Sequence, residues 1–121
     1  MKRAIFTTIV LLLLTSPLLG ADWGDDGKQG IVRKGWIIAS TPELAWEATM
    51  HLNAKKHKEL ADIYQKHGTD IFIVQNQFEA TIVKVYIRDS MVKCQSDAEE
   101  IRALFNNGIF WCVIGAVETI P

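Results

Sequence analysis

The sequence lacks most of the features that mark specialised classes of protein. Only two of its 121 residues are cysteines, too few for a disulfide-dense scaffold or a four-cysteine zinc site. The formal net charge is −1, which gives no electrostatic reason to expect a nucleic acid partner. Internal repeats and low-complexity stretches are also missing. What remains is a chain with 49% hydrophobic residues, which excludes wholesale disorder and fits one globular domain.

The chain begins with a short basic segment that is followed by an apolar run and then by small residues. Lys2 and Arg3 precede residues 4–14, Pro17 interrupts the run, and Ala21 ends it. This order is typical of a secretory signal peptide and predicts cleavage after Ala21. The alternative, an uncleaved anchor, is disfavoured because residues 5–21 fall short of the roughly 20 apolar residues that a spanning helix needs. We therefore predict a periplasmic or secreted protein without stable membrane insertion after cleavage.

Removal of residues 1–21 leaves 100 residues with eleven basic and fourteen acidic side chains, a net charge of −3. The next nine, 22–30, include three glycines and three aspartates. This composition favours a flexible lead-in. Residues 31–121 are then predicted to form a single α+β domain, with a first strand over 31–40.

Two helices are expected after this strand, as a helical hairpin. Thr41 can cap the first helix, Pro42 suits its first position, and Glu43 faces the positive end of the helix dipole. The second helix ends at His67, where Gly68 provides the stop.

The rest of the chain is mainly strand. Over residues 81–88, β-branched side chains at the odd-numbered positions alternate with mostly polar side chains at the even-numbered positions. Such a period of two is typical of a half-buried strand. A capping box at Ser96 and Glu99 predicts a short helix over 97–105. The remaining strands are expected at 71–74, 91–95 and 109–114.

The last strand carries a short pattern, Gly108-Ile109-Phe110-Trp111-Cys112-Val113. With the order of elements from residue 35 to residue 117, this Gly-x-x-Trp-x-Val pattern resembles that of small exported bacterial proteins with an SH3-like barrel. The resemblance implies a small SH3-like antiparallel barrel or curled sheet with an inserted helical hairpin, and a role in binding peptides or cell-wall material. The helix predicted at 97–105 departs from the usual pattern and would be an insertion between barrel strands.

Cys94 and Cys112 both fall in predicted strands. An even number of cysteines in an exported chain favours a disulfide, because that compartment is oxidising. The bond would staple the inserted helix to the sheet and contribute about 3 kcal/mol in the chain-entropy model. The alternative is two separate buried thiols.

Three histidines, His51, His57 and His67, lie in or beside the hairpin, but no two are three or four residues apart. They therefore do not share a helix face as a zinc pair does. A bridged site with Glu47 or Asp62 is the alternative to solvated positions. We predict no metal and no cofactor.

No hydrolase motif occurs in the sequence, which favours a non-enzymatic protein. Aromatic residues near predicted strands are the best indication of a binding surface: Trp36, Phe78, Tyr86 and Trp111. The first hypothesis is thus an exported binding module for a protein, a peptide or cell-wall material, with no nucleic acid partner. A small inhibitor or immunity-type protein that blocks a partner enzyme is the alternative. A hydrolase or metal-dependent enzyme is the third hypothesis.

Overall fold

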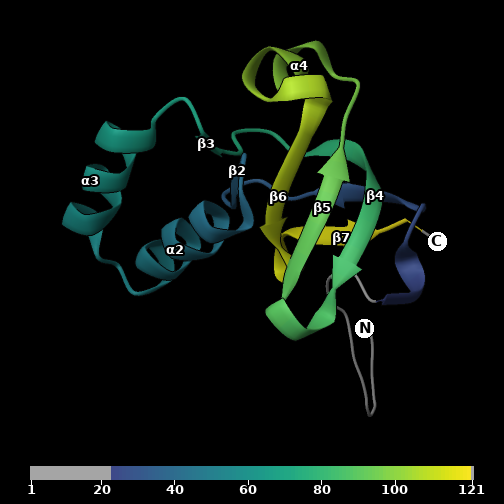
Figure 1. Ribbon diagram of the computed structural model, residues 1–121, viewed down its shortest axis with the longest axis horizontal. Helices are drawn as coiled ribbons and strands as arrows, with labels where there is room; N and C mark the ends of the chain where they lie inside the picture. The colour runs from purple at the N-terminus through teal and green to yellow at the C-terminus, as the bar shows by residue number, and fades with distance from the viewer. Residues whose placement is uncertain (1–22, 121) are drawn as a thin grey trace.

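The computed structural model describes residues 23–120, and the predicted signal peptide lies outside the described residues (Figure 1). The chain forms a mixed α+β fold with seven strands and three α-helices in the described part. The strands are β1 (Gln29–Val32), β2 (Ile37–Ala39), β3 (Ile71–Ile73), β4 (Phe78–Tyr86), β5 (Met91–Gln95), β6 (Ile109–Val113) and β7 (Val117–Thr119). The α-helices are α2 (Pro42–Asn53), α3 (His57–His67) and α4 (Glu99–Leu104). Short 3-10 turns are η1 (Trp23–Asp25), η2 (Ile87–Asp89), η3 (Asn106–Gly108) and η4 (Ile114–Ala116).

All seven strands belong to one antiparallel sheet, in the order β3-β2-β6-β5-β4-β1-β7. The order ends at β3 on one side and β7 on the other, so the sheet is not closed into a barrel. In Figure 1, β1 and β7 run across the direction of β4, β5 and β6, which shows how strongly the sheet is curled. Of the two predicted forms, the structure has an open curled sheet.

The first predicted strand, residues 31–40, is wrong in one respect because it is two strands. β1 ends at Val32 and β2 begins at Ile37, and the two pair with different neighbours. Gly35 lies between them with φ +89°, a conformation that side chains rarely adopt. The chain therefore turns here and leads from one end of the sheet order to the other.

The predicted flexible lead-in is also different in the structure, although Asp22 lies outside the described residues. Gln29 and Gly30 belong to β1. Before them, the Gly27 amide donates to the Ile82 carbonyl at 2.6 Å, and the Val85 amide donates to the Asp26 carboxylate at 2.9 Å. Glycine and aspartate here form specific contacts with β4, which composition alone does not reveal.

The helical hairpin is confirmed. Thr41 is the N-cap of α2, and its hydroxyl accepts a hydrogen bond from the Leu44 amide at 3.2 Å. Pro42 is the first helical residue, and α3 ends at His67 before Gly68. In Figure 1, α2 lies beside the sheet and α3 lies outside it. These local signals were enough because caps act within one turn of helix.

The predicted capping box is wrong. α4 begins at Glu99 and its N-cap is Ala98, which makes no side-chain capping bond. Ser96 is buried two residues earlier, where its hydroxyl accepts from the Ala98 amide at 3.1 Å and donates to the Glu79 carbonyl at 3.3 Å. Serine thus stabilises the turn before the helix and ties it to β4.

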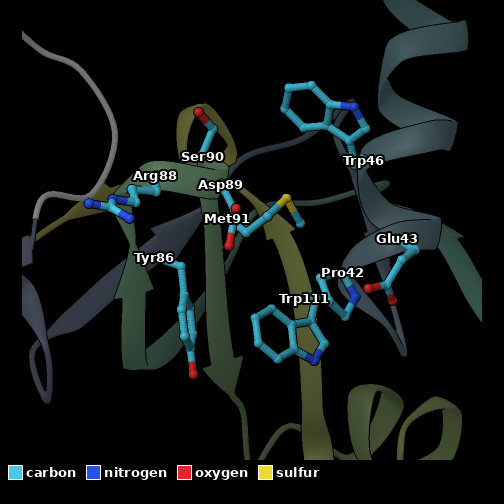
Figure 2. A pocket seen from close by; sticks show the side chains of 9 residues that line it. All are labelled: Pro42, Glu43, Trp46, Tyr86, Arg88, Asp89, Ser90, Met91 and Trp111. Atoms are coloured by element: carbon cyan, nitrogen blue, oxygen red, sulfur yellow. The ribbon is translucent and has the colours of Figure 1, made fainter.

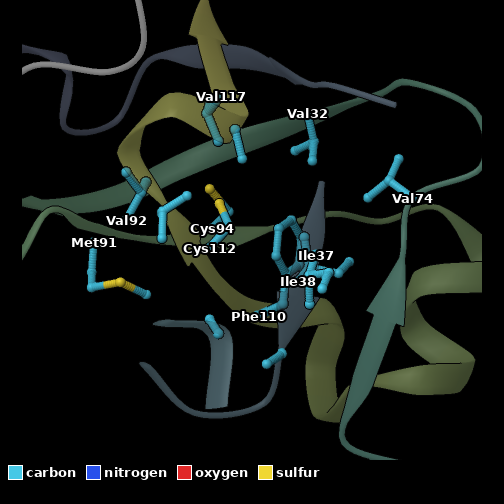
Figure 3. Close-up of a cluster of buried hydrophobic side chains, with 14 of the residues drawn as sticks. Val32, Ile37, Ile38, Val74, Met91, Val92, Cys94, Phe110, Cys112 and Val117 are labelled. Atoms are coloured by element: carbon cyan, nitrogen blue, oxygen red, sulfur yellow. The ribbon is translucent and has the colours of Figure 1, made fainter. Parts of the chain in front are cut away.

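The core lies on both faces of the curled sheet, around Phe110 on the inner face and beneath α2 on the outer face (Figure 3). Its largest fully buried side chain is Phe110 of β6, against which Phe78 packs edge-on with ring centroids 5.7 Å apart. Aliphatic side chains from β1, β2, β4, β5 and β7 complete this cluster: Val32, Ile37, Ile38, Ile82, Val92 and Val117. Burial of several such side chains, each contributing about 1.5–3 kcal/mol, opposes the conformational entropy of a small domain. On the outer face, α2 packs over β6, Met91 and Val113 are buried, and the remainder of β4, β5 and β6 forms a surface.

Candidate binding groove

A groove opens between the first turns of α2 and the outer face of β4, β5 and β6 (Figure 2). Its volume is about 600 Å³, within the range of small-ligand sites. The lining combines aromatic, charged and apolar side chains: Pro42, Glu43, Trp46, Tyr86, Arg88, Asp89, Ser90, Met91 and Trp111. Its three aromatic residues come from three elements, so the groove exists only in the folded chain.

Trp46 forms the helical wall of the groove. The buried side of α2 consists of Ala45, Ala48 and Thr49. Trp46 follows Ala45 directly, and one residue along a helix is a rotation of about 100°. Its side chain is therefore turned off the buried stripe and is 44% exposed. A large exposed aromatic beside a hollow is typical of an interaction surface.

Tyr86 and Trp111 form the floor. Their ring centroids lie 5.3 Å apart with an interplanar angle of 39°, a contact that holds both rings in place. Alternation along β6 places the neighbouring aromatics on opposite faces, since Phe110 is fully buried and Trp111 is half-buried. Half-burial leaves part of the indole available to a ligand while the rest packs on the fold.

A β-bulge decides which side chains of β4 reach this face. Ile82 pairs with Cys94, but Lys84 pairs with Lys93, so Val83 is an extra residue. The bulge changes the phase of alternation, with the result that Ile82 and Val85 are both buried and Val83 is 42% exposed. The simple alternation predicted over residues 81–88 is therefore wrong. Without the extra residue, Tyr86 would share the face of Ile82.

Two lysines flank the aromatic floor. The Lys84 ammonium lies over the Tyr86 ring, 5.3 Å from its centroid, and the Lys93 ammonium lies over Trp111 at 5.8 Å. These distances are within the range of cation–π attraction. Within the described residues, neither lysine has an ion-pair partner. The floor therefore carries a local positive charge.

The rim of the groove is the turn between β4 and β5. Ser90 adopts the left-handed conformation with φ 57°, and its carbonyl accepts from the Ile114 amide at 2.9 Å. This bond anchors the turn to the chain beyond β6. Arg88 and Asp89 are exposed on the turn, so the rim carries one charge of each sign.

The four aromatics predicted as a binding surface fall into separate places. Tyr86 and Trp111 come together in the groove, whereas Phe78 packs on the core ring of Phe110. Trp36 lies against Gly115, where a Cβ would be 3.0 Å from its ring. Trp46 lies on α2, outside the strand aromatics that the sequence favours as a binding surface. Its place off the apolar helical stripe was the signal in the sequence.

Cys94 and Cys112 are brought together but are free thiols in the structure (Figure 3). They lie 4.3 Å apart and are not bonded. Cys112 pairs directly with Val92, and Cys94 with Phe110, so the two cysteines occupy diagonal positions on the core face. Interaction with the Cys94 side chain, together with full burial, raises the pKa of the Cys112 thiol well above its usual range.

The histidines lie at the helical hairpin. His51 and His67 line a shallow hollow of about 310 Å³ with Glu47 and Asp62 among its other residues. The His51 Nε2 is 3.9 Å from a Glu47 carboxylate oxygen. Across residues 23–120, no group of three histidine, cysteine or acidic side chains is placed to hold a metal ion.

Comparison with known proteins finds no family model, curated protein or solved structure that matches this chain. Among residues 23–120, no helix has the length and apolar character that crossing a membrane requires.

Proposed function

We propose that the protein is an exported, non-enzymatic binding module that holds its ligand in the groove between α2 and the outer face of the sheet. One observation carries this proposal. Three aromatic side chains, Trp46, Tyr86 and Trp111, converge on one hollow from α2, β4 and β6. Aromatic side chains that line a hollow are typical of binding sites, and they dominate the energy of many interfaces.

Two further proposals from the sequence, export and kinship with a family of small proteins, are compatible with this role. Export rests on the signal-peptide pattern of residues 1–21. Kinship with small exported SH3-like proteins rests on the Gly-x-x-Trp-x-Val pattern, whose tryptophan is Trp111 of the groove floor. The alternative, an inhibitor, would act through a protruding loop. Two polar loops are the candidates for this role: residues 75–77, which line a second hollow beside α4, and residues 89–90, which form the rim of the groove itself.

Binding in the groove is tested with the isotope-labelled protein by amide and indole NMR. Soluble cell-wall fragments and short peptides serve as the two probe panels. At least one panel is expected to shift the resonances of the groove residues, and Trp46→Ala is expected to weaken that binding about tenfold or more. Because Trp46 is exposed, this variant keeps the core intact.

Leu104→Ala is the matched control, since Leu104 is also a large exposed apolar residue, at 41%, but lies on α4 in the second hollow. It is expected to bind as the unaltered protein does. Shifts that map to the second hollow and disappear in the Leu104 variant would contradict the proposal, as would a complete lack of response to both panels. Cell fractionation with antibody detection tests export separately.

A further inference from the structure

The paired lysines beside the groove indicate what kind of ligand it takes. Lys84 and Lys93 are directly opposite each other on adjacent antiparallel strands, so both side chains project from the outer face. Like charges in this position repel, and no acid of residues 23–120 pairs with either one. An anionic group placed between them would relieve the repulsion. The local charge therefore complements a negatively charged ligand.

The other charged groups that line the groove restrict the class of ligand further. Glu43 on α2 and Asp89 on the rim are exposed and line the same groove, and Arg88 lies beside Asp89. A polymer with only anionic groups would meet the two carboxylates and be repelled. A ligand that carries both a carboxylate and hydroxyl donors satisfies both sides, because carboxylates accept hydrogen bonds from hydroxyls.

The floor favours rings with flat apolar faces. Tyr86 and Trp111 are half-buried with 5.3 Å between their centroids, and the Lys84 and Lys93 ammonium groups lie over one face of each ring, so a ligand meets the aromatic surface that remains. The carbon–hydrogen face of a sugar ring packs on such a surface, while its hydroxyl edge stays wet. A platform that is already in place costs little ordering when a ligand binds.

We propose that the groove binds an acidic glycan, whose carboxylate lies between Lys84 and Lys93 and whose sugar rings lie on Tyr86 and Trp111. The hydroxyl groups of the same chain would donate to Glu43 and Asp89 at the other side of the groove. This inference rests on the proposed function and names the class of its ligand.

The test uses the full chain as the cell produces it, with a short oligogalacturonate as the probe. The methyl ester of the same oligomer is the matched neutral probe. The acidic oligomer is expected to shift the indole resonances of Trp46 and Trp111. Affinity is expected to fall about tenfold for the ester, for Lys84→Gln and for Lys93→Gln, and also on raising the salt concentration.

Lys34→Gln provides the control, since Lys34 is an exposed lysine in the turn before β2 and lies neither on β4 nor on β5 beside the aromatic floor. It is expected to bind the acidic oligomer as the unaltered chain does. Well-dispersed amide spectra of all three variants confirm that they fold.

Three outcomes overturn the acidic-glycan proposal, and they differ in whether the proposed binding function of the groove survives. Equal binding of the acid and the ester, unchanged by the lysine variants, leaves the groove as a site for a neutral ligand. Groove shifts with a short polyglutamate peptide, but none with the oligogalacturonate, leave a peptide-binding module. No shift with either of these probes or with the panels above removes both the inference and the proposed function.

Discussion

Lys84 of β4 stands directly opposite Lys93 of β5, and each ammonium lies over an aromatic ring of the same face. Replacement of either lysine removes their repulsion but also removes one cation–π contact, so single variants do not isolate the repulsion. A double-mutant cycle does. We expect the change in unfolding free energy caused by Lys93→Gln to be about 0.5 kcal/mol more stabilising when residue 84 is lysine than when it is glutamine. Urea unfolding of the four proteins measures this difference, and high salt should reduce it.

Gly108 has φ +70°, and a Cβ there would overlap the backbone carbonyl oxygen of Ser96. Gly108→Ala should therefore strain the backbone and push apart the turn before β6, with a loss of about 2–4 kcal/mol in unfolding free energy. Gly24→Ala is the control because nothing lies within 4 Å of a Cβ at that position. Equal stability of the two variants would show that the turn adapts freely.

Thr49 is 1% exposed on the inner side of α2, and its hydroxyl has no hydrogen-bond partner among the residues that the structure describes. Valine has the same shape without the polar group. Thr49→Val should raise the unfolding free energy by about 1 kcal/mol, because an unsatisfied buried hydroxyl is costly. The exposed Thr69→Val is expected to change it little. A destabilised Thr49 variant would indicate that the hydroxyl is bonded in solution.

The raised pKa of the Cys112 thiol predicts how the stability of the reduced protein depends on pH. Above the ordinary thiol pKa of about 8.5, the unfolded chain loses its proton first, so the unfolded state gains stability. The unfolding free energy should be unaffected by this thiol below that pH. Above it, the free energy should fall by up to about 1.4 kcal/mol per pH unit. Urea titrations across this range measure the slope, and in Cys112→Ala the thiol's share should disappear.

Oxidation of the cysteine pair is the outcome expected in an oxidising compartment. The two thiols give up two protons and two electrons to a disulfide donor, and the thiols of that donor are the reduced product. Closure from 4.3 Å requires a small shift of β5 against β6, because the positions are diagonal. Alkylation of the unfolded, unreduced protein followed by mass spectrometry should find no free thiol. Oxidised protein should be about 3 kcal/mol more stable than reduced protein. Two alkylated cysteines in the exported protein would contradict this prediction.

The parts of the fold that depend on neighbouring residues were predictable. Thr41, Pro42 and Glu43 mark the start of α2 because a cap and the helix dipole act over a single turn. Phe110 and Trp111 separate because adjacent residues of a strand point to opposite faces. Local patterns misled where distant contacts compete with them. Ser96 looked like a helix cap, but its hydroxyl bonds to β4 and the next turn.

By itself, the sequence determined the order of most helices and strands and the presence of aromatics suited to binding, and its first 21 residues predict export. Only the tertiary structure decided which aromatics meet. The bulge at Val83 turns Lys84 and Tyr86 outward, and α2 brings Trp46 to the same face. Both depend on pairing between residues far apart in the chain, and an extra residue in one strand becomes visible only against its partner strand.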